Sequence, residues 1–236
     1  MPTNAQGQPI GADVPGWDGA RDIPYSAMHG HFCDVAPLDM THGPDLFTAY
    51  SADTTGTLWT YMPTGPFDDI EKLTEWLQTC CASRDPLFFA IIDKQTSKAV
   101  GVASFLRIKP KDGVVEVGYI AFAPALQKTA AATEAMYLMM RHVFDLGYRR
   151  YEWKCDALNA ASQAAAKRLG FHYDGLFRQA LVYKGRNRDT AWFSILDRDW
   201  PRIKHAFEQW LDPSNFDDHG QQIRRLSDWM PTDLQT

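Results

Sequence analysis

One carboxylate interrupts an otherwise apolar stretch, VVEVGYIAF at residues 114–122. In a strand, strict alternation would place Glu116, Ile120 and Phe122 on one face. An unpaired carboxylate inside a sheet is costly, so Glu116 needs either a cationic partner or a chemical task. The task that fits is that of a general base, which takes a proton from an attacking nucleophile directly or through water. The structural alternative is an ion pair with a neighbouring cation such as Arg107.

A loop of small residues follows this stretch and leads into a helical pattern, AFAPALQKTAAATE at residues 121–134. Backbone N–H groups at a helix N-terminus bind anionic groups such as a pyrophosphate. Threonine hydroxyls could add further donors. The alternative is an ordinary helix start, because alanine is the best helix former. The candidate binding residues are Gln127, Lys128, Thr129, Ala130, Ala131, Ala132 and Thr133.

Hydrophobic periodicity predicts the elements that must position these residues. Three consecutive strands with short turns predict an antiparallel meander, and a central helix then crosses between strands. The order indicates an α+β fold with one domain at 30–211, an extended arm at 1–29 and a C-terminal tail at 212–236. We expect strands at 31–38, 87–93, 99–108, 114–122, 150–155, 171–183 and 189–197, and helices at 44–52, 70–83, 128–146, 159–169 and 199–211.

Composition narrows the classes of function. Of the 236 residues, 45% are hydrophobic and 22% charged, which is ordinary for a globular protein. The net charge of −5 argues against nucleic acid as the main partner. No apolar run is long enough to span a membrane. The four cysteines lack CxxC spacing and the histidines lack HExxH spacing, so we expect reduced thiols, a cytoplasmic location and no metal site.

In their order and spacing, these motifs resemble the core of the GCN5-related N-acetyltransferases (GNAT), in particular their ribosomal-protein (RimJ/RimL-like) branch, over roughly residues 31–200. The family's loop has Gln or Arg, two residues, then Gly-x-Gly or Gly-x-Ala. Here Gln127, Ala130 and Ala132 stand at those positions, so both glycines are alanines. The family's next motif, an Asn, a small residue three positions later and then Leu-Gly-Phe, matches Asn159 and Ser162.

The resemblance implies a GNAT-like acyl-CoA N-acyltransferase fold, with helices flanking a central mixed, mostly antiparallel sheet that is splayed at its middle. Acetyl-CoA would lie in the splay, with no metal. An amine would attack the thioester directly in a ternary complex. Backbone N–H groups at Ile120, Ala121 and Phe122 would stabilise the developing oxyanion. The acceptor would be a protein N-terminus or a small-molecule amine, and the protein a monomer or homodimer.

The resemblance also implies roles for single residues. Asn159 would anchor the arm of CoA, and Ser162 would donate a hydrogen bond to the departing thiolate. The family's tyrosine acid is replaced here by Ala166. The alternative for Asn159 is a simple helix N-cap, with Ser162 facing solvent. Glu116 stands at the spacing before the loop glutamine at which the family's histone-modifying branch places its base.

The predicted substrate-binding residues are Glu116 and three others. Trp59 and Tyr61 belong to a loop that covers the acceptor site in this fold, although packing under a proline-rich loop would also explain them. Arg178 could bind an acidic acceptor or a CoA phosphate. Lys184 and Arg186 are better explained as a solvated hairpin tip. A non-catalytic CoA-binding or sensor module, or a partner-binding domain without CoA, stays open as an alternative.

Overall fold

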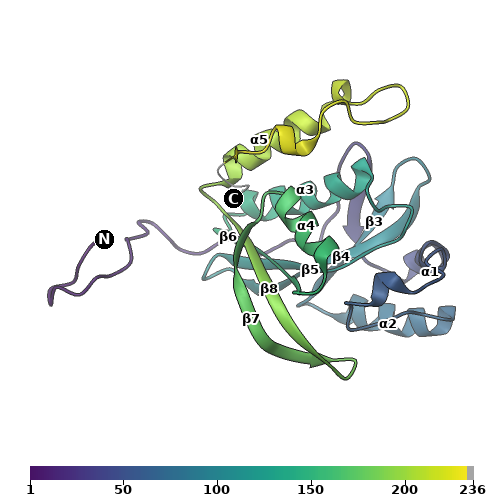
Figure 1. Ribbon diagram of the computed structural model, residues 1–236, viewed down its shortest axis with the longest axis horizontal. Helices are drawn as coiled ribbons and strands as arrows, with labels where there is room; N and C mark the ends of the chain where they lie inside the picture. The colour runs from purple at the N-terminus through teal and green to yellow at the C-terminus, as the bar shows by residue number, and fades with distance from the viewer. Residues whose placement is uncertain (233–236) are drawn as a thin grey trace.

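The computed structural model describes residues 1–232. Its strands form one sheet in the order β1-β2-β3-β4-β5-β6-β8-β7 (Figure 1). Neighbouring strands are antiparallel except β5 and β6, which are parallel. This confirms the predicted mixed, mostly antiparallel sheet. The strands are β1 Met28–His29, β2 Cys33–Pro37, β3 Leu87–Asp93, β4 Lys98–Lys109, β5 Val114–Phe122, β6 Arg150–Asp156, β7 His172–Tyr183 and β8 Arg186–Leu196.

Helices cover both faces of the sheet, as the alternation along β3 shows. Phe89 and Ile91 pack in the core with α3 and α5, whereas Phe88 and Ala90 pack in a second core with α1 and α2. Successive side chains of a strand point to opposite faces, so the two helix pairs lie on opposite sides (Figure 1). The α-helices are α1 Gly43–Ser51, α2 Ile70–Ala82, α3 Ala130–Asp145, α4 Ala160–Arg168 and α5 Trp200–Leu211.

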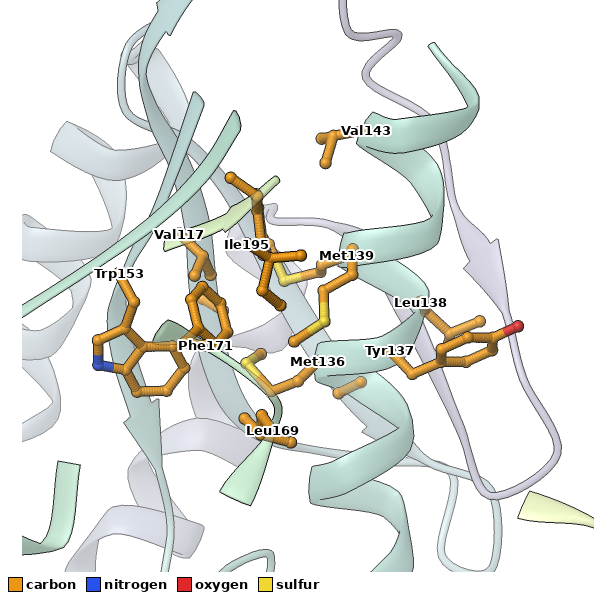
Figure 2. Close-up of a cluster of buried hydrophobic side chains, with 14 of the residues drawn as sticks. Val117, Met136, Tyr137, Leu138, Met139, Val143, Trp153, Leu169, Phe171 and Ile195 are labelled. Atoms are coloured by element: carbon orange, nitrogen blue, oxygen red, sulfur yellow. The ribbon is translucent and has the colours of Figure 1, made fainter. Parts of the chain in front are cut away.

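Helix α3 is the central helix of the larger core. Figure 2 shows Met136 and Met139 pointing toward Phe171 and Ile195, which come from the sheet side. Tyr137 lies on the other side of the helix, where its ring stacks at 5.3 Å on a phenylalanine of α5. The helix therefore packs on two partners at once, and this fixes where its N-terminus lies.

The sheet opens between β5 and β6. Their parallel ladder joins only Val114–Val117 to Arg150–Trp153. Beyond it, β5 stays paired with β4 as far as Phe122, and β6 stays paired with β8 as far as Asp156. Each strand thus follows its outer neighbour, and the two separate from each other. The splay implied by the family resemblance is present.

The N-terminal arm, residues 1–29, is attached to the body at two aromatic residues. The Trp17 indole N–H donates a hydrogen bond to the Lys111 carbonyl oxygen at 2.9 Å. The Tyr25 hydroxyl donates to the Phe88 carbonyl oxygen at 2.8 Å. These two hydrogen bonds hold the arm against the body of the protein.

A buried carboxylate fixes where β2 begins. Glu134 of α3 accepts backbone N–H groups from His31, Phe32 and Cys33 at 2.7, 2.6 and 2.9 Å. These N–H groups are therefore satisfied by a side chain and not by a neighbouring strand. The strand consequently starts two residues later than the predicted position 31.

The chain beyond α5 is more than a surface covering. Leu226 and Met230 are buried in the larger core, next to α5. The last positions of the predicted tail, 233–236, lie outside the described residues.

The β7–β8 turn is tighter than predicted: Lys184 and Gly185 both have positive φ, 48° and 71°, as a two-residue hairpin turn requires. Strand β8 therefore begins at Arg186.

Candidate active site

A cleft of about 1830 Å³ occupies the opening between β5 and β6. Both separating strands contribute side chains to it, and so do the N-terminal turn of α3, helix α4 and the β7–β8 hairpin. Among its lining residues are Glu116, Gly118, Tyr119, Ile120, Phe122, Gln127, Lys128, Thr129, Lys154, Cys155, Asp156, Asn159 and Ser162. The structure thus brings together most of the residues predicted from the sequence.

Glu116 lies in an ion-pair network at the base of the opening. Its carboxylate is 2.6 Å from Lys154 Nζ and 3.4 Å from Arg107 Nε. Lys154 also contacts the Glu152 carboxylate at 2.9 Å and lies 3.6 Å from the centre of the Trp192 ring. Burial raises the pKa of Glu116, and the attraction of Lys154 opposes this rise only in part. The cationic partner expected as the structural alternative is present, and Lys154 was not foreseen.

The predicted alternation along β5 is wrong beyond Gly118. Tyr119 has φ of 50°, and the ladder with β4 shifts register at this point. Such a bulge inserts one residue and reverses the faces that follow it. Val117 and Ile120 therefore both face the core of α3, whereas Ala121, fully buried, packs in the core of α1 and α2. Ala121 is therefore not among the residues that line the cleft, contrary to its predicted place at the cofactor.

The loop before α3 has a conformation that explains its alanines. The positive φ, 62°, belongs to Lys128, and Thr129 caps the helix by accepting the Ala132 N–H at 3.1 Å. Ala130 and Ala132 lie in the first helical turn, where alanine is favoured over glycine. Gln127 donates to the Phe122 carbonyl oxygen at 2.8 Å, which ties the loop to β5.

Arg168 is a cation at this end of the cleft that the sequence analysis missed. Its guanidinium donates to the Thr133 hydroxyl at 3.1 Å, from the end of α4 to the start of α3. No carboxylate pairs with it in residues 1–232. Nothing in its local sequence distinguishes it from its neighbour Lys167, because only the tertiary fold brings the end of α4 beside the start of α3.

At the start of α4, Asn159 fits the role of a helix cap, while Ser162 is placed where it could contact a ligand. Asn159 accepts the Ser162 N–H at 3.0 Å and so caps the helix, as the structural alternative holds. Ser162, however, lines the cleft and accepts the Trp153 indole N–H at 3.0 Å. Because its oxygen accepts that bond, its own proton can be donated elsewhere.

Two predicted substrate contacts need correction. Trp59 is 2% exposed and packs edge-on against Tyr50 and Phe67, at 5.0 Å from each. It supports the loop from inside and does not reach the cleft. Arg178 is exposed on β7 and does not line the cleft, whereas its neighbour Phe177 on the same strand does. Tyr61 does line the cleft, and its hydroxyl donates to the Leu158 carbonyl oxygen at 3.1 Å.

The β7–β8 turn is docked, contrary to the expectation of a solvated tip. Lys184 Nζ donates to the carbonyl oxygens of Trp59, Thr64 and Gly65 at 2.9, 3.2 and 2.8 Å. Arg186 donates to the carbonyl oxygen next to Trp59 at 3.1 Å. The hairpin therefore holds the Trp59–Tyr61 loop against the cleft. All four acceptors of this contact are backbone carbonyl oxygens, which leave no mark in the sequence.

Asp156 is a second carboxylate of the cleft that the sequence analysis did not single out. It is buried at the end of β6, where the Tyr183 hydroxyl donates to it at 2.8 Å and the Leu158 N–H at 2.8 Å. Its signal in the sequence was a carboxylate directly after the predicted strand 150–155 and just before the Asn159 motif.

Comparison with known proteins gives this geometry a family. The acetyltransferase (GNAT) domain family matches residues 35–172. The chain belongs to the GNAT acetyltransferases. A GNAT structure from Brucella melitensis is 43% identical, with a TM-score of 0.89, over 92% of this chain and 99% of that one. A GNAT-family structure from Chromobacterium violaceum ATCC 12472 is 40% identical, with a TM-score of 0.76, over 82% of this chain and 97% of that one.

The uncharacterized N-acetyltransferase p20 of Bacillus licheniformis is 29% identical over 144 residues, which are 59% of this GNAT chain and 80% of p20. At the level of fold alone, the chain is similar to the Salmonella typhimurium enzyme that modifies the N-terminal serine of ribosomal protein L7/L12 (21% identity, TM-score 0.61). It is likewise similar to the microcin C7 self-immunity acetyltransferase in complex with acetyl-CoA and AMP (20% identity, TM-score 0.63).

This GNAT protein is an acetyltransferase, and the described residues contain no cluster of metal-binding side chains. Across residues 1–232, no helix is long and apolar enough to cross a membrane. The four cysteines are free thiols. Burial raises the pKa of the Cys155 thiol in the cleft, and the Ser162 hydroxyl opposes the rise.

Proposed function

We propose that this GNAT enzyme transfers the acetyl group of acetyl-CoA to a primary amine by direct attack within a ternary complex. The observation that carries the proposal is the position of the cleft, which begins where β5 and β6 separate and runs past the N-terminus of α3. The first place suits a thioester, and the second an anionic pyrophosphate. When bound, acetyl-CoA supplies an activated acetyl group.

The residues at the α3 end would bind the pyrophosphate. The N–H groups of Ala130 and Ala131 lie at the positive end of the helix, whereas those of Thr129, Ala132 and Thr133 already donate to oxygens of the turn. The Arg168 guanidinium, held by Thr133, adds a positive charge that no carboxylate of residues 1–232 neutralises. This charge would attract a phosphate without requiring a close approach of backbone to phosphate.

The residues at the other end would activate the amine. Glu116 would accept a proton from the amine, directly or through water, as the new C–N bond forms. Its raised pKa makes it a stronger base than an exposed carboxylate. A backbone N–H in the stretch Ile120–Phe122 would stabilise negative charge on the carbonyl oxygen. Ser162 would donate to the sulfur as the C–S bond breaks.

The acceptor would be a cationic amine before it loses its proton. Asp156 lines the cleft and offers it a carboxylate, whereas the carboxylate of Glu116 is already paired with Lys154, and Tyr61 encloses it from the loop side. We infer that the acceptor is a protein N-terminus or a small-molecule amine. The fold-level likeness to an enzyme that modifies an N-terminal serine makes such a peptide the first acceptor to test. Free thiols suit a reducing compartment such as the cytoplasm.

Thermal unfolding with acetyl-CoA, followed by a panel of amines, tests the proposal. A ligand at about 100 times its Kd adds about 2.7 kcal/mol to a protein that binds it only when folded. For a chain of this size we expect the Tm to rise by roughly 5–10 °C. The panel contains peptides with a free or blocked N-terminus and polyamines. The absence of any shift at millimolar acetyl-CoA would refute the proposal, and binding without transfer would favour a CoA sensor.

A further inference from the structure

The cleft continues beyond the N-terminus of α3 to a mouth built by segments outside the family domain. The matched domain covers residues 35–172. The mouth is lined by His31 and Phe32 from before it, and by Trp210, Phe216 and residues 219–222 from after it. In Figure 1 the loop that follows α5 lies over one end of α3. We call residues 212–225 the C-terminal loop.

We propose that the C-terminal loop and Phe32 form a binding site for the 3′-phosphoadenosine end of acetyl-CoA. This inference rests on the proposed function, which sets the thioester between β5 and β6 and the pyrophosphate at the start of α3. The nucleotide must then extend away from the splay. On that side the cleft is walled by the C-terminal loop.

The wall offers an aromatic surface suited to a base. The Phe216 ring lies 5.0 Å from that of Phe32 and 5.3 Å from that of Trp210, both in edge contact. Phe32 and Phe216 are half-buried and line the cleft, while Trp210 is buried behind them. Aromatic faces stack on adenine, whatever their sequence context. The amides of Gln95 and Gln221 also line the mouth and can bond to the edge of the base.

Positive charge stands beside this surface. Lys94, in the turn between β3 and β4, lines the mouth, and its Nζ is 3.3 Å from the Asp34 carboxylate. Its side chain is 40% exposed. It can therefore reach a phosphate at the mouth while Asp34 holds its direction. We assign Lys94 to the 3′-phosphate.

The loop is preformed, so binding need not order it. Asn215 is buried and donates to the carbonyl oxygens of Trp210 and Arg224 at 2.9 and 3.1 Å. It also accepts the Arg224 N–H at 2.9 Å. The Trp210 indole N–H donates to Gln222 at 2.9 Å across the loop. A site held in its bound shape loses less entropy when the ligand arrives.

The test compares two acetyl donors in the full-length enzyme. S-acetylpantetheine has the thioester but no nucleotide. We expect Phe216→Ala to raise the KM for acetyl-CoA about tenfold and that for S-acetylpantetheine less than twofold. Adenosine 3′,5′-bisphosphate should compete with acetyl-CoA in the wild type and bind about tenfold more weakly to the variant. Ile223→Ala, an exposed residue of the same loop, is the matched control.

Further variants keep the test decisive if Phe216→Ala does not fold. Phe216→Tyr retains the ring and should retain the KM. Lys94→Ala should weaken the binding of acetyl-CoA severalfold. It should leave unchanged the binding of acetyl-dephospho-CoA, which lacks the 3′-phosphate. Equal losses with both donors, or no loss with acetyl-CoA, would overturn the nucleotide site alone. A wild type that does not use acetyl-CoA would remove the proposed function and this site with it.

Discussion

Lys154 Nζ lies 2.6 Å from the carboxylate of Glu116, and this contact decides how Glu116 can act. The same lysine lies 2.9 Å from Glu152, the register partner of Glu116 on β6. The pKa values of the two glutamates are nevertheless shifted in opposite directions. Burial dominates for Glu116 and raises its pKa. Burial also opposes ionisation of Glu152, but hydrogen bonds from Arg150 and Lys154 outweigh it and lower the pKa.

Glu116→Gln tests the proposed base. A base acts when ionised, so kcat/KM should rise as the pH passes upward through the pKa of Glu116, which burial raises above the ordinary value of a glutamate. The variant should lose this limb and about 100-fold in rate at neutral pH. Glu152→Gln is the matched control: it removes the other partner of Lys154 but has a lowered pKa, and it should keep the limb. An unchanged profile in Glu116→Gln would assign proton removal to water alone.

Ser162→Ala tests the donor to the sulfur. Because the hydrogen bond strengthens only as negative charge develops there, we expect kcat to fall about 10–100-fold while the KM for acetyl-CoA changes little. Steady-state kinetics at saturating amine separate the two parameters. Lys167→Ala, exposed on the same helix, controls for effects on α4. A loss confined to KM would make Ser162 a binding residue.

Ala130→Gly tests whether the alanines weaken the phosphate loop. Residue 130 is helical, and the positive φ of the loop belongs to Lys128. Glycine there should therefore destabilise the fold by about 1 kcal/mol, lowering the Tm by roughly 2–4 °C, without tightening acetyl-CoA. Calorimetric titration and thermal unfolding measure both effects. Tighter binding by the glycine variant would show that the family loop is impaired here.

Lys184→Met tests the contact between the hairpin and the acceptor loop. Its ammonium donates to three carbonyl oxygens of the segment from Trp59 to Gly65. Without this ammonium the loop should become more mobile. The free energy of amine binding should then weaken by about 1 kcal/mol, which raises the KM for the amine about fivefold. The KM for acetyl-CoA should not change. Lys109→Met, an exposed lysine of β4, is the control. Equal changes for both substrates would contradict a role confined to the acceptor.

The sequence determined the elements and their order, because these depend on local patterns. Strands β3 and β5 begin and end at the predicted residues, and the α3 helix lies within the predicted range. Periodicity, caps and turn residues act within a few positions of the chain. The spacing of the loop and of the Asn159 motif likewise sufficed to indicate the family and the start of α4 as part of the cleft.

Only the tertiary structure decided which side chains reach the cleft. A single bulge at Tyr119 places the residues that follow it on the opposite face of β5 from the one predicted, and no residue type in the sequence indicates such an insertion. Trp59 does not reach the cleft because it packs in the core of α1 and α2. Arg178 does not line the cleft, although its β7 neighbour Phe177 does. Arg168 and Lys184 take part in the site only because of contacts with residues 35 and 125 positions away in the chain. Such contacts depend on how elements pack in space, which local sequence does not encode.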